Sequence, residues 1–180
     1  TIHVDEANFD ECQSQKNWAP LVPKGSSNVF FVYSLAPFQV MSLDRDSCKA
    51  RLVTPGGMQS PDLSQVRSGT RYVHGMDVAE GSIYWSVAHT PPVKYNAVLT
   101  AVLEKNGRQF ELIGTSCGFN IPGLINPDEL FAYPNSILDF DSSSDLAHVT
   151  FHIDDAQNRI ATVRGVSSWL KQAYKKWQQE

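Results

Sequence analysis

The chain has 180 residues, of which 42% are hydrophobic, 11% aromatic and 19% charged. This composition is typical of a folded domain and excludes a disordered or fibrous chain. Fifteen basic and nineteen acidic residues give a net charge of -4, which argues against a protein that follows nucleic-acid phosphates with a basic face.

Short β-like runs separated by turns fill most of the chain. They are rich in Val, Ile, Phe, Tyr and Trp, and several alternate apolar with polar residues. Asn106-Gly107 supplies the two positive-φ residues of a type I′ hairpin turn, whereas the Asp- and Ser-rich run 139–145 is expected to be a solvated loop. The sequence therefore predicts antiparallel strands over residues 28–34, 38–43, 50–53, 82–89, 96–104, 109–113, 129–133, 147–153 and 160–163.

One amphipathic helix is expected to close the chain. Its apolar positions recur at helical spacing and form a single stripe. They are Val166, Trp169, Leu170, Ala173 and Trp177. Such a stripe favours a helix that covers the edge of a sheet, and a partner surface or a membrane-surface helix is the alternative.

A weak internal repeat connects three of the predicted strands. The segments 29–34, 82–89 and 147–155 each hold a strand that ends in a polar, chemically capable residue, followed by a short loop and a second strand. A β-propeller blade has this layout. We therefore expect an all-β antiparallel β-propeller with about three blades visible over residues 1–164, and a helix at 165–180 that packs on the same domain. A β-sandwich or barrel is the alternative.

Several short motifs occur in a characteristic order along the chain. They are Gln15-Lys16-Asn17-Trp18-Ala19-Pro20, Phe30-Phe31-Val32-Tyr33-Ser34-Leu35-Ala36-Pro37, Ser68-Gly69-Thr70, Ala88-His89-Thr90, Tyr95 and the run 149–155. This series resembles the five-bladed β-propeller glycosidase-like clan, which includes mannoside phosphorylases and hydrolases and related β-mannosyltransferase-like proteins. The resemblance implies that the chain corresponds to the C-terminal part of that propeller, with the other blades preceding Thr1 or supplied by a partner chain.

The resemblance also implies a carbohydrate-active protein, either a glycosyltransferase or an inverting glycoside phosphorylase or hydrolase, with a sugar in the central funnel. The chain departs from the pattern at Gln15, where Glu is usual, and at His152, which replaces a Gly. The segment that carries the family's general-acid Asp has no counterpart in this sequence. A non-catalytic sugar-binding or scaffolding β-domain is therefore the alternative function.

The candidate site residues follow from these motifs and from their chemistry. Asp155 and His89 are the candidate catalytic residues, expected to orient the substrate or to act as a base. Positive side chains would hold anionic groups, and aromatic and amide side chains would grip a sugar. These candidate substrate-binding residues are Lys16, Asn17, Trp18, Tyr33, Ser34, Arg71 and Tyr84. The alternatives are a solvated Lys16, a structural His89 and a turn carboxylate at Asp155.

The expected partners are a saccharide or glycan, with phosphate or a sugar nucleotide as further candidates. No cofactor, metal site, nucleic-acid partner or membrane span is expected, because no corresponding motif or long apolar run is present. Cys12, Cys48 and Cys117 allow either one disulfide and a free thiol or three reduced thiols. The secretory-pathway lumen or the extracellular space is favoured as the location, with the cytoplasm as the alternative.

Overall fold

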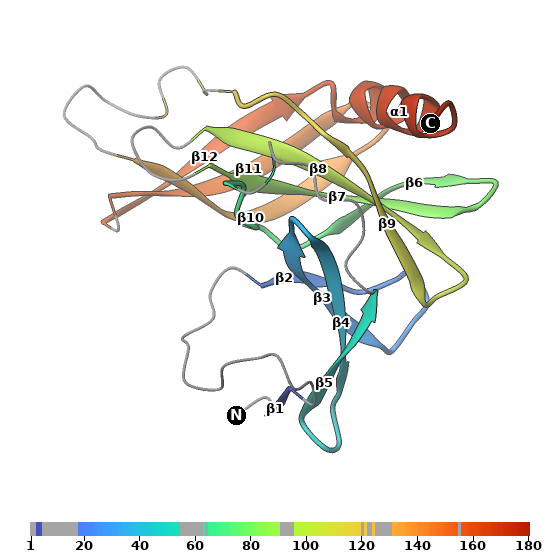
Figure 1. The fold of residues 1–180 in the computed structure, drawn as a ribbon. Coiled ribbons are helices and arrows are strands. Elements are labelled where there is room, and N and C mark those ends of the chain that lie inside the picture. Colours follow the sequence, from blue (N-terminus) through green and yellow to red (C-terminus); the bar gives the residue numbers. More distant parts are fainter. Residues whose placement is uncertain are drawn as a thin grey trace.

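The computed structural model describes residues 3–4, 18–54, 63, 65–90, 96–119, 121, 124, 131–154 and 156–180. These residues form strands in three sheets and one C-terminal helix, as Figure 1 shows. The elements are β1 His3–Val4, β2 Ala19–Leu21, β3 Val29–Leu35, β4 Phe38–Asp44, β5 Lys49–Thr54, β6 Val73–Val78, β7 Gly81–His89, β8 Ala97–Lys105, β9 Gln109–Thr115, β10 Ala132–Asp141, β11 Leu146–Ile153, β12 Gln157–Arg164 and α1 Val166–Trp177.

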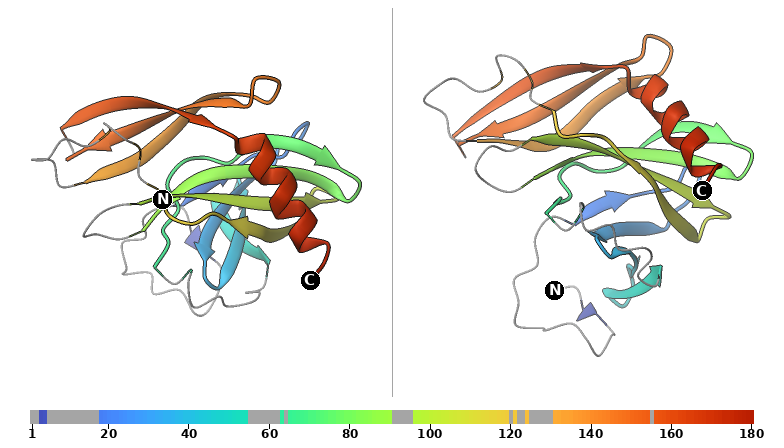
Figure 2. Two further views of the ribbon diagram at one scale, coloured as in Figure 1. Left: turned by 90° about the horizontal axis from the view of Figure 1, so that it is seen from above. Right: turned by 45° about the horizontal axis from the view of Figure 1, so that its top comes forward.

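The predicted antiparallel meander is confirmed in all three sheets. Sheet 1 has the order β1-β5-β4-β3-β2, sheet 2 the order β6-β7-β8-β9 and sheet 3 the order β10-β11-β12. From β2 onward, strands that follow one another within the same sheet pair antiparallel, whereas β1 pairs with β5 in parallel. The three sheets lie as successive layers with sheet 2 in the middle (Figures 1 and 2).

Strand boundaries differ from the sequence prediction in sheet 3. The strand expected over 129–133 is instead β10, which runs to Asp141 and takes in part of the Asp- and Ser-rich run that was expected to be a loop. The register of β10 against β11 shifts between Pro134 and Ser136 and again between Ile137 and Asp139. These irregularities interrupt the alternation of apolar and polar residues, so the pattern does not indicate a single long strand.

Sheet 2 is buried on both of its faces. One face, which carries Trp85 and Leu99, packs with sheet 3 and α1 in a single apolar cluster. The other face, which carries Tyr84 and Val102, packs against sheet 1. Strand β8 is consequently apolar at almost every position instead of alternating, because neither of its faces meets water.

The predicted helix α1 is confirmed, and it packs on β9 and β6 of sheet 2. Two glycines on these strands let it approach closely. A Cβ at Gly75 would lie 2.5 Å from Leu170 Cδ1, and a Cβ at Gly114 would lie 2.8 Å from Ala173 Cβ. The part of the chain that the structure describes holds no helix long and apolar enough to cross a bilayer.

The start of α1 is capped from outside the helix. Gly165, the N-cap residue, has φ 83° and contributes no side-chain cap. Asp145 in the β10–β11 turn replaces it, because its Oδ1 accepts a hydrogen bond from the Ser167 N–H at 2.6 Å and its Oδ2 one from the Ser168 hydroxyl at 3.0 Å. A carboxylate at this position also interacts favourably with the helix dipole.

Candidate functional site

The segment 66–72, which precedes β6, lies between sheet 1 and the end of β7. Arg67 and His89 exchange backbone hydrogen bonds at 2.8 and 2.9 Å, so the segment continues sheet 2 beyond β6. On its other side, Tyr72 forms a parallel bridge with Leu21 of β2 and donates its N–H to the Pro20 carbonyl at 2.8 Å. The edge strand β2 of sheet 1 and the segment that leads into β6 of sheet 2 are therefore neighbours.

The same segment also contacts β10, the first strand of sheet 3. A Cβ at Gly69 would lie 2.5 Å from the Val87 carbonyl oxygen and 2.7 Å from Pro134 Cγ, so only glycine fits between β7 and β10 at this point. Two residues further on, the Arg71 guanidinium donates to the Ile137 carbonyl at 3.4 Å. The contacts advance together along both segments, which therefore run in the same direction.

Buried hydroxyl groups fix the segment in place. Thr70 Oγ1 accepts a hydrogen bond from the Val87 N–H at 3.0 Å, and the Ser86 hydroxyl donates to the Thr70 carbonyl at 2.8 Å. The Tyr72 hydroxyl lies 2.9 Å from Thr100 Oγ1, and burial raises the pKa of Tyr72 far above its usual value. Because each of these buried polar groups has a partner, the network holds the segment in one position.

His89 lies at the end of β7, where this segment begins. Its side chain is 4% exposed, and its ring meets the Tyr133 ring edge to face at a centroid distance of 4.8 Å. Burial and then the positive charge of Arg67 lower the pKa of His89 to about 4. The imidazole is therefore neutral at pH 7 and does not offer a cation to an anionic group.

An aromatic pair lies at the beginning of β2. The rings of Trp18 and Tyr33 meet edge to face at 5.6 Å, and Trp18 also lies 5.7 Å from Phe31. Both Trp18 and Tyr33 are partly exposed, and Ser34, the next candidate, pairs with Gln39 of β4. This pair presents aromatic surface of the kind that packs against sugars.

Two other predicted site residues lie elsewhere. Tyr84 is 1% exposed and its hydroxyl accepts a hydrogen bond from the Lys24 backbone N–H at 2.7 Å. It occupies the opposite face of β7 from His89, about 16 Å further back along the strand at the usual rise per residue. The Arg71 guanidinium is directed to the β10 backbone, as described above. The structure therefore does not bring Tyr84 to His89.

The remaining candidates, Lys16, Asn17 and Asp155, lie outside the described residues. Asp154, which precedes Asp155, accepts a hydrogen bond from the Phe131 N–H at 2.9 Å and has φ 49°. The Asp154 carboxylate thus closes the end of the β10–β11 ladder, a role of the kind that the sequence analysis gave as the alternative for the neighbouring Asp155.

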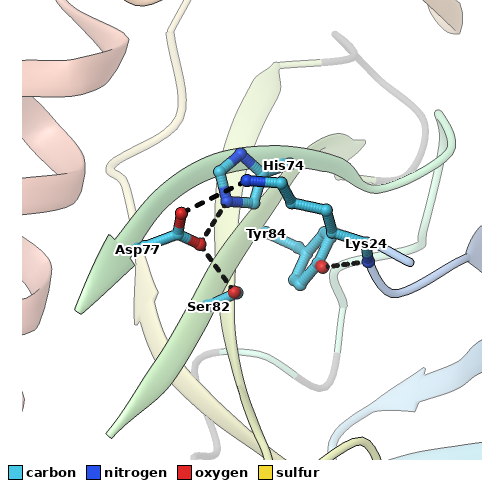
Figure 3. Close-up of polar contacts among 5 residues, drawn as sticks. All are labelled: Lys24, His74, Asp77, Ser82 and Tyr84. Carbon is cyan, nitrogen blue, oxygen red and sulfur yellow. Dashed lines mark hydrogen bonds and ion pairs between the residues drawn. The ribbon is translucent and has the colours of Figure 1, made fainter. Parts of the chain in front are cut away.

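A polar network that the sequence analysis missed surrounds Asp77 at the far end of the β6–β7 hairpin (Figure 3). Asp77 Oδ1 lies 2.7 Å from His74 Nε2 and accepts a hydrogen bond from the Ser82 hydroxyl at 2.8 Å. Lys24 Nζ lies 3.4 Å from Asp77 Oδ2. The hydrogen bonds from His74 and then Ser82 lower the pKa of Asp77 to about 2.

The network around Asp77 is not a catalytic relay. In a serine relay the histidine takes the serine proton, whereas Ser82 here donates to Asp77 itself. The contacts link the Lys24 loop of sheet 1 to the β6–β7 hairpin of sheet 2 (Figure 3). The spacing of His74 and Asp77, three residues apart near the end of a strand, is the sequence feature from which this contact could have been predicted.

No group of three or more His, Cys, Asp or Glu side chains within the described ranges is arranged to hold a metal ion. Comparisons with known proteins add no relative. No protein-family model matches the chain, and neither a curated protein nor a solved structure matches it.

Proposed function

We propose that the chain is an arc of a β-propeller that binds a saccharide where its first strands begin. One observation carries the proposal. The segment 66–72 lies between β2, an edge strand of sheet 1, and β10, an edge strand of sheet 3. It forms a parallel bridge with β2 at Leu21 and Tyr72, and its residues Gly69 and Arg71 contact β10 at Pro134 and Ile137. In a propeller, the blades are arranged around a central channel, so their innermost strands are neighbours in this way.

The open sides of the arc support a further part of the proposal. Sheet 3 exposes large apolar side chains, since Leu138 is 50% and Ile160 is 64% exposed. Further blades or a partner chain packed on this side would remove that surface from water. The proposed assembly is therefore a five-bladed propeller to which this chain contributes three blades.

The side chains at the start of β2 and of the segment 66–72 suit a sugar. Trp18 and Tyr33 offer partly exposed aromatic surface, and neutral His89 lies at the end of β7 with Arg67 beside it. Lys16, Asn17 and Asp155 are proposed to complete the site by adding charged and amide groups. In the enzymatic version, a glycosyltransferase or an inverting phosphorylase or hydrolase, Asp155 would act as the carboxylate on one side of the glycosidic bond.

A non-catalytic saccharide-binding or scaffolding domain is the second candidate. Its support is the environment of the two candidate catalytic positions. His89 is almost fully buried, and the carboxylate of Asp154, next to Asp155, accepts a backbone hydrogen bond from Phe131. An imidazole with a pKa of about 4 is a weak base at pH 7, which disfavours His89 as a general base.

The test combines a glycan array that includes mannosides with calorimetric titration of the best ligand. We expect Trp18→Leu to weaken binding by tenfold or more, because stacking of the sugar on the indole is lost. Trp177→Leu, which alters a tryptophan on α1, is the matched control and should leave the affinity unchanged. An array without any ligand, or an equal loss in both variants, would refute saccharide binding at this face.

Turnover separates the two versions of the proposal. An active enzyme should process the bound saccharide, with water, phosphate or an acceptor sugar as the second substrate, and Asp155→Asn should abolish turnover while binding remains. Saccharide binding without turnover in the presence of water, phosphate or an acceptor sugar would support the non-catalytic saccharide-binding or scaffolding domain.

A further inference from the structure

A cleft of about 690 Å³ lies on sheet 1, away from the aromatic pair of Trp18 and Tyr33. Strands β3, β4 and β5 form one wall, and Arg108 of the β8–β9 turn reaches it from sheet 2. This volume is within the range of small-molecule sites in proteins.

Strand register explains why the cleft residues share one face. Phe30 of β3, Ser42 of β4 and Arg51 of β5 lie opposite one another across three paired strands. The Phe30 ring packs against Phe110 of β9 at 4.7 Å, so this face turns toward sheet 2. Arg108 precedes β9 by one residue, and it therefore approaches the same cleft from the other side.

The cleft is positively charged although the chain is acidic. Four cationic side chains line it, namely Arg45, Lys49, Arg51 and Arg108, against the two carboxylates Asp44 and Asp46. In the part of the chain that the structure describes, no ion pair or side-chain hydrogen bond engages the three arginines. Among the described residues these three arginines therefore hold no direct ion pair, although the charge of Arg51 contributes to lowering the pKa of Asp44.

The Asp44 carboxylate is already used within its own turn. Its Oδ1 accepts hydrogen bonds from the backbone N–H groups of Asp46 and Ser47 at 3.0 and 3.3 Å, and its Oδ2 accepts one from the Ser47 hydroxyl at 2.7 Å. These bonds, led by the Ser47 hydroxyl, lower the pKa of Asp44. Asp44 is thus held within the β4–β5 turn, where the charge of Arg51 interacts with it through space and without a hydrogen bond.

We propose that this cleft binds the ester of a tetrahedral oxyanion, a phosphate or a sulfate attached to an organic group. Guanidinium groups recognise such anions with paired hydrogen bonds, and two of these, Arg51 and Arg108, come from different sheets and face one space. Ser27, Asn28 and Ser42 supply neutral donors at the same wall. The apolar side chains Phe30 and Val53 contact the organic part of the ligand, which a bare ion would lack.

The site is separate from the proposed saccharide site. Phe30 lies on the face of β3 that packs against sheet 2, whereas Phe31 contacts Trp18, which contacts Tyr33. Binding in the cleft can therefore be tested whatever the outcome of the saccharide experiments.

The test is titration of the whole chain with two probes that share one organic group, phenyl phosphate and phenyl sulfate, at low and at physiological salt. We expect saturable binding of at least one probe that weakens as salt rises. Arg51→Gln and Arg108→Gln should each weaken it by about tenfold or more, in keeping with loss of a charge-assisted contact. Preference for phenyl phosphate would assign a phosphorylated ligand, and preference for phenyl sulfate a sulfated one.

Arg164→Gln is the matched control, because Arg164 is an exposed arginine at the end of β12 and its loss changes the net charge equally. It should bind as the unaltered chain does. Circular dichroism and thermal unfolding would verify that all three variants are folded. Absence of saturable binding of both probes, or an equal effect of Arg164→Gln and Arg51→Gln, would overturn the proposal.

Discussion

The contact between Gly75 and Leu170 allows a sharp test of how α1 is held on sheet 2. Leu170 is fully buried, and its Cδ1 lies where a side chain at position 75 would begin. We consider three variants, Leu170→Ala, Gly75→Ala and the double variant. The double variant should be more stable than the sum of the two single effects predicts.

The magnitudes follow from the distances. Leu170→Ala removes three buried carbons and leaves a cavity, so it should lower the free energy of unfolding by about 2–5 kcal/mol. Gly75→Ala alone places a methyl group 2.5 Å from Leu170 Cδ1, and such overpacking costs about 1–3 kcal/mol.

The clash disappears in the double variant, because Leu170→Ala removes Cδ1. The next contacts of the new methyl group are then the Ile83 carbonyl oxygen and Trp85 Cδ1, both at 3.3 Å. The methyl group also occupies part of the cavity. A favourable coupling free energy of about 1–3 kcal/mol is therefore expected.

Urea unfolding followed by tryptophan fluorescence and by circular dichroism measures these values. The matched control is Gly114→Ala combined with Leu170→Ala. A Cβ at Gly114 meets Ala173 and not Leu170, so the two effects should add. Additive effects in the Gly75 pair, or equal coupling in both pairs, would refute the packing described for α1.

Three further predictions concern single polar groups. Asp145→Ala should lower the free energy of unfolding by about 1 kcal/mol in urea titrations, because α1 loses its cap. Asp145→Asn should retain most of the stability, because an amide oxygen still accepts a hydrogen bond from the Ser167 N–H, and equal losses in the two variants would contradict the capping role. The pKa of Asp77 is about 2 in the folded chain, so this carboxylate stabilises the fold above pH 3.8, its usual pKa, and the contribution is lost as pH falls toward 2. His74→Gln should raise the pKa of Asp77 in a carboxyl NMR titration, and an unchanged pKa would contradict the contact with His74. The pKa of His89 is about 4 in the folded chain and 6.5 when the chain is unfolded, so unfolding takes up a proton and the stability of the fold decreases between pH 6.5 and pH 4. His89→Gln should reduce this pH dependence in unfolding titrations, and an imidazole pKa near 6.5 measured by NMR in the folded chain would refute the argument from burial.

Local pattern determined how far the sequence could predict the fold. The run 97–103 is apolar except at Thr100 and Asn106-Gly107 follows it, so β8 and its hairpin were predictable. Strands β2 and β6 were missed, because β2 has only three residues and includes Pro20, while β6 is interrupted by Gly75. Neither strand has the apolar alternation on which the prediction depends.

The candidate site shows a different limit. Positions 84 and 89 have opposite parity on one continuous strand, so their placement on opposite faces could have been predicted from the sequence. The approach of Gly69 to Pro134 and of Arg108 to Arg51 could not, because each joins segments of different sheets. Such neighbours depend on how the sheets stack, and strand pattern carries no information about that stacking.

The burial of sheet 2 on both faces limits how the chain can be shortened. A fragment that ended before β10 would turn Trp85, Val87 and Leu99 to water, and one that began after β5 would do the same with Val98 and Val102. Exposed apolar strands of this kind associate with one another, so either fragment would tend to precipitate when expressed. Sheet 2 is thus the part of the chain that no soluble fragment can contain without both of its neighbours.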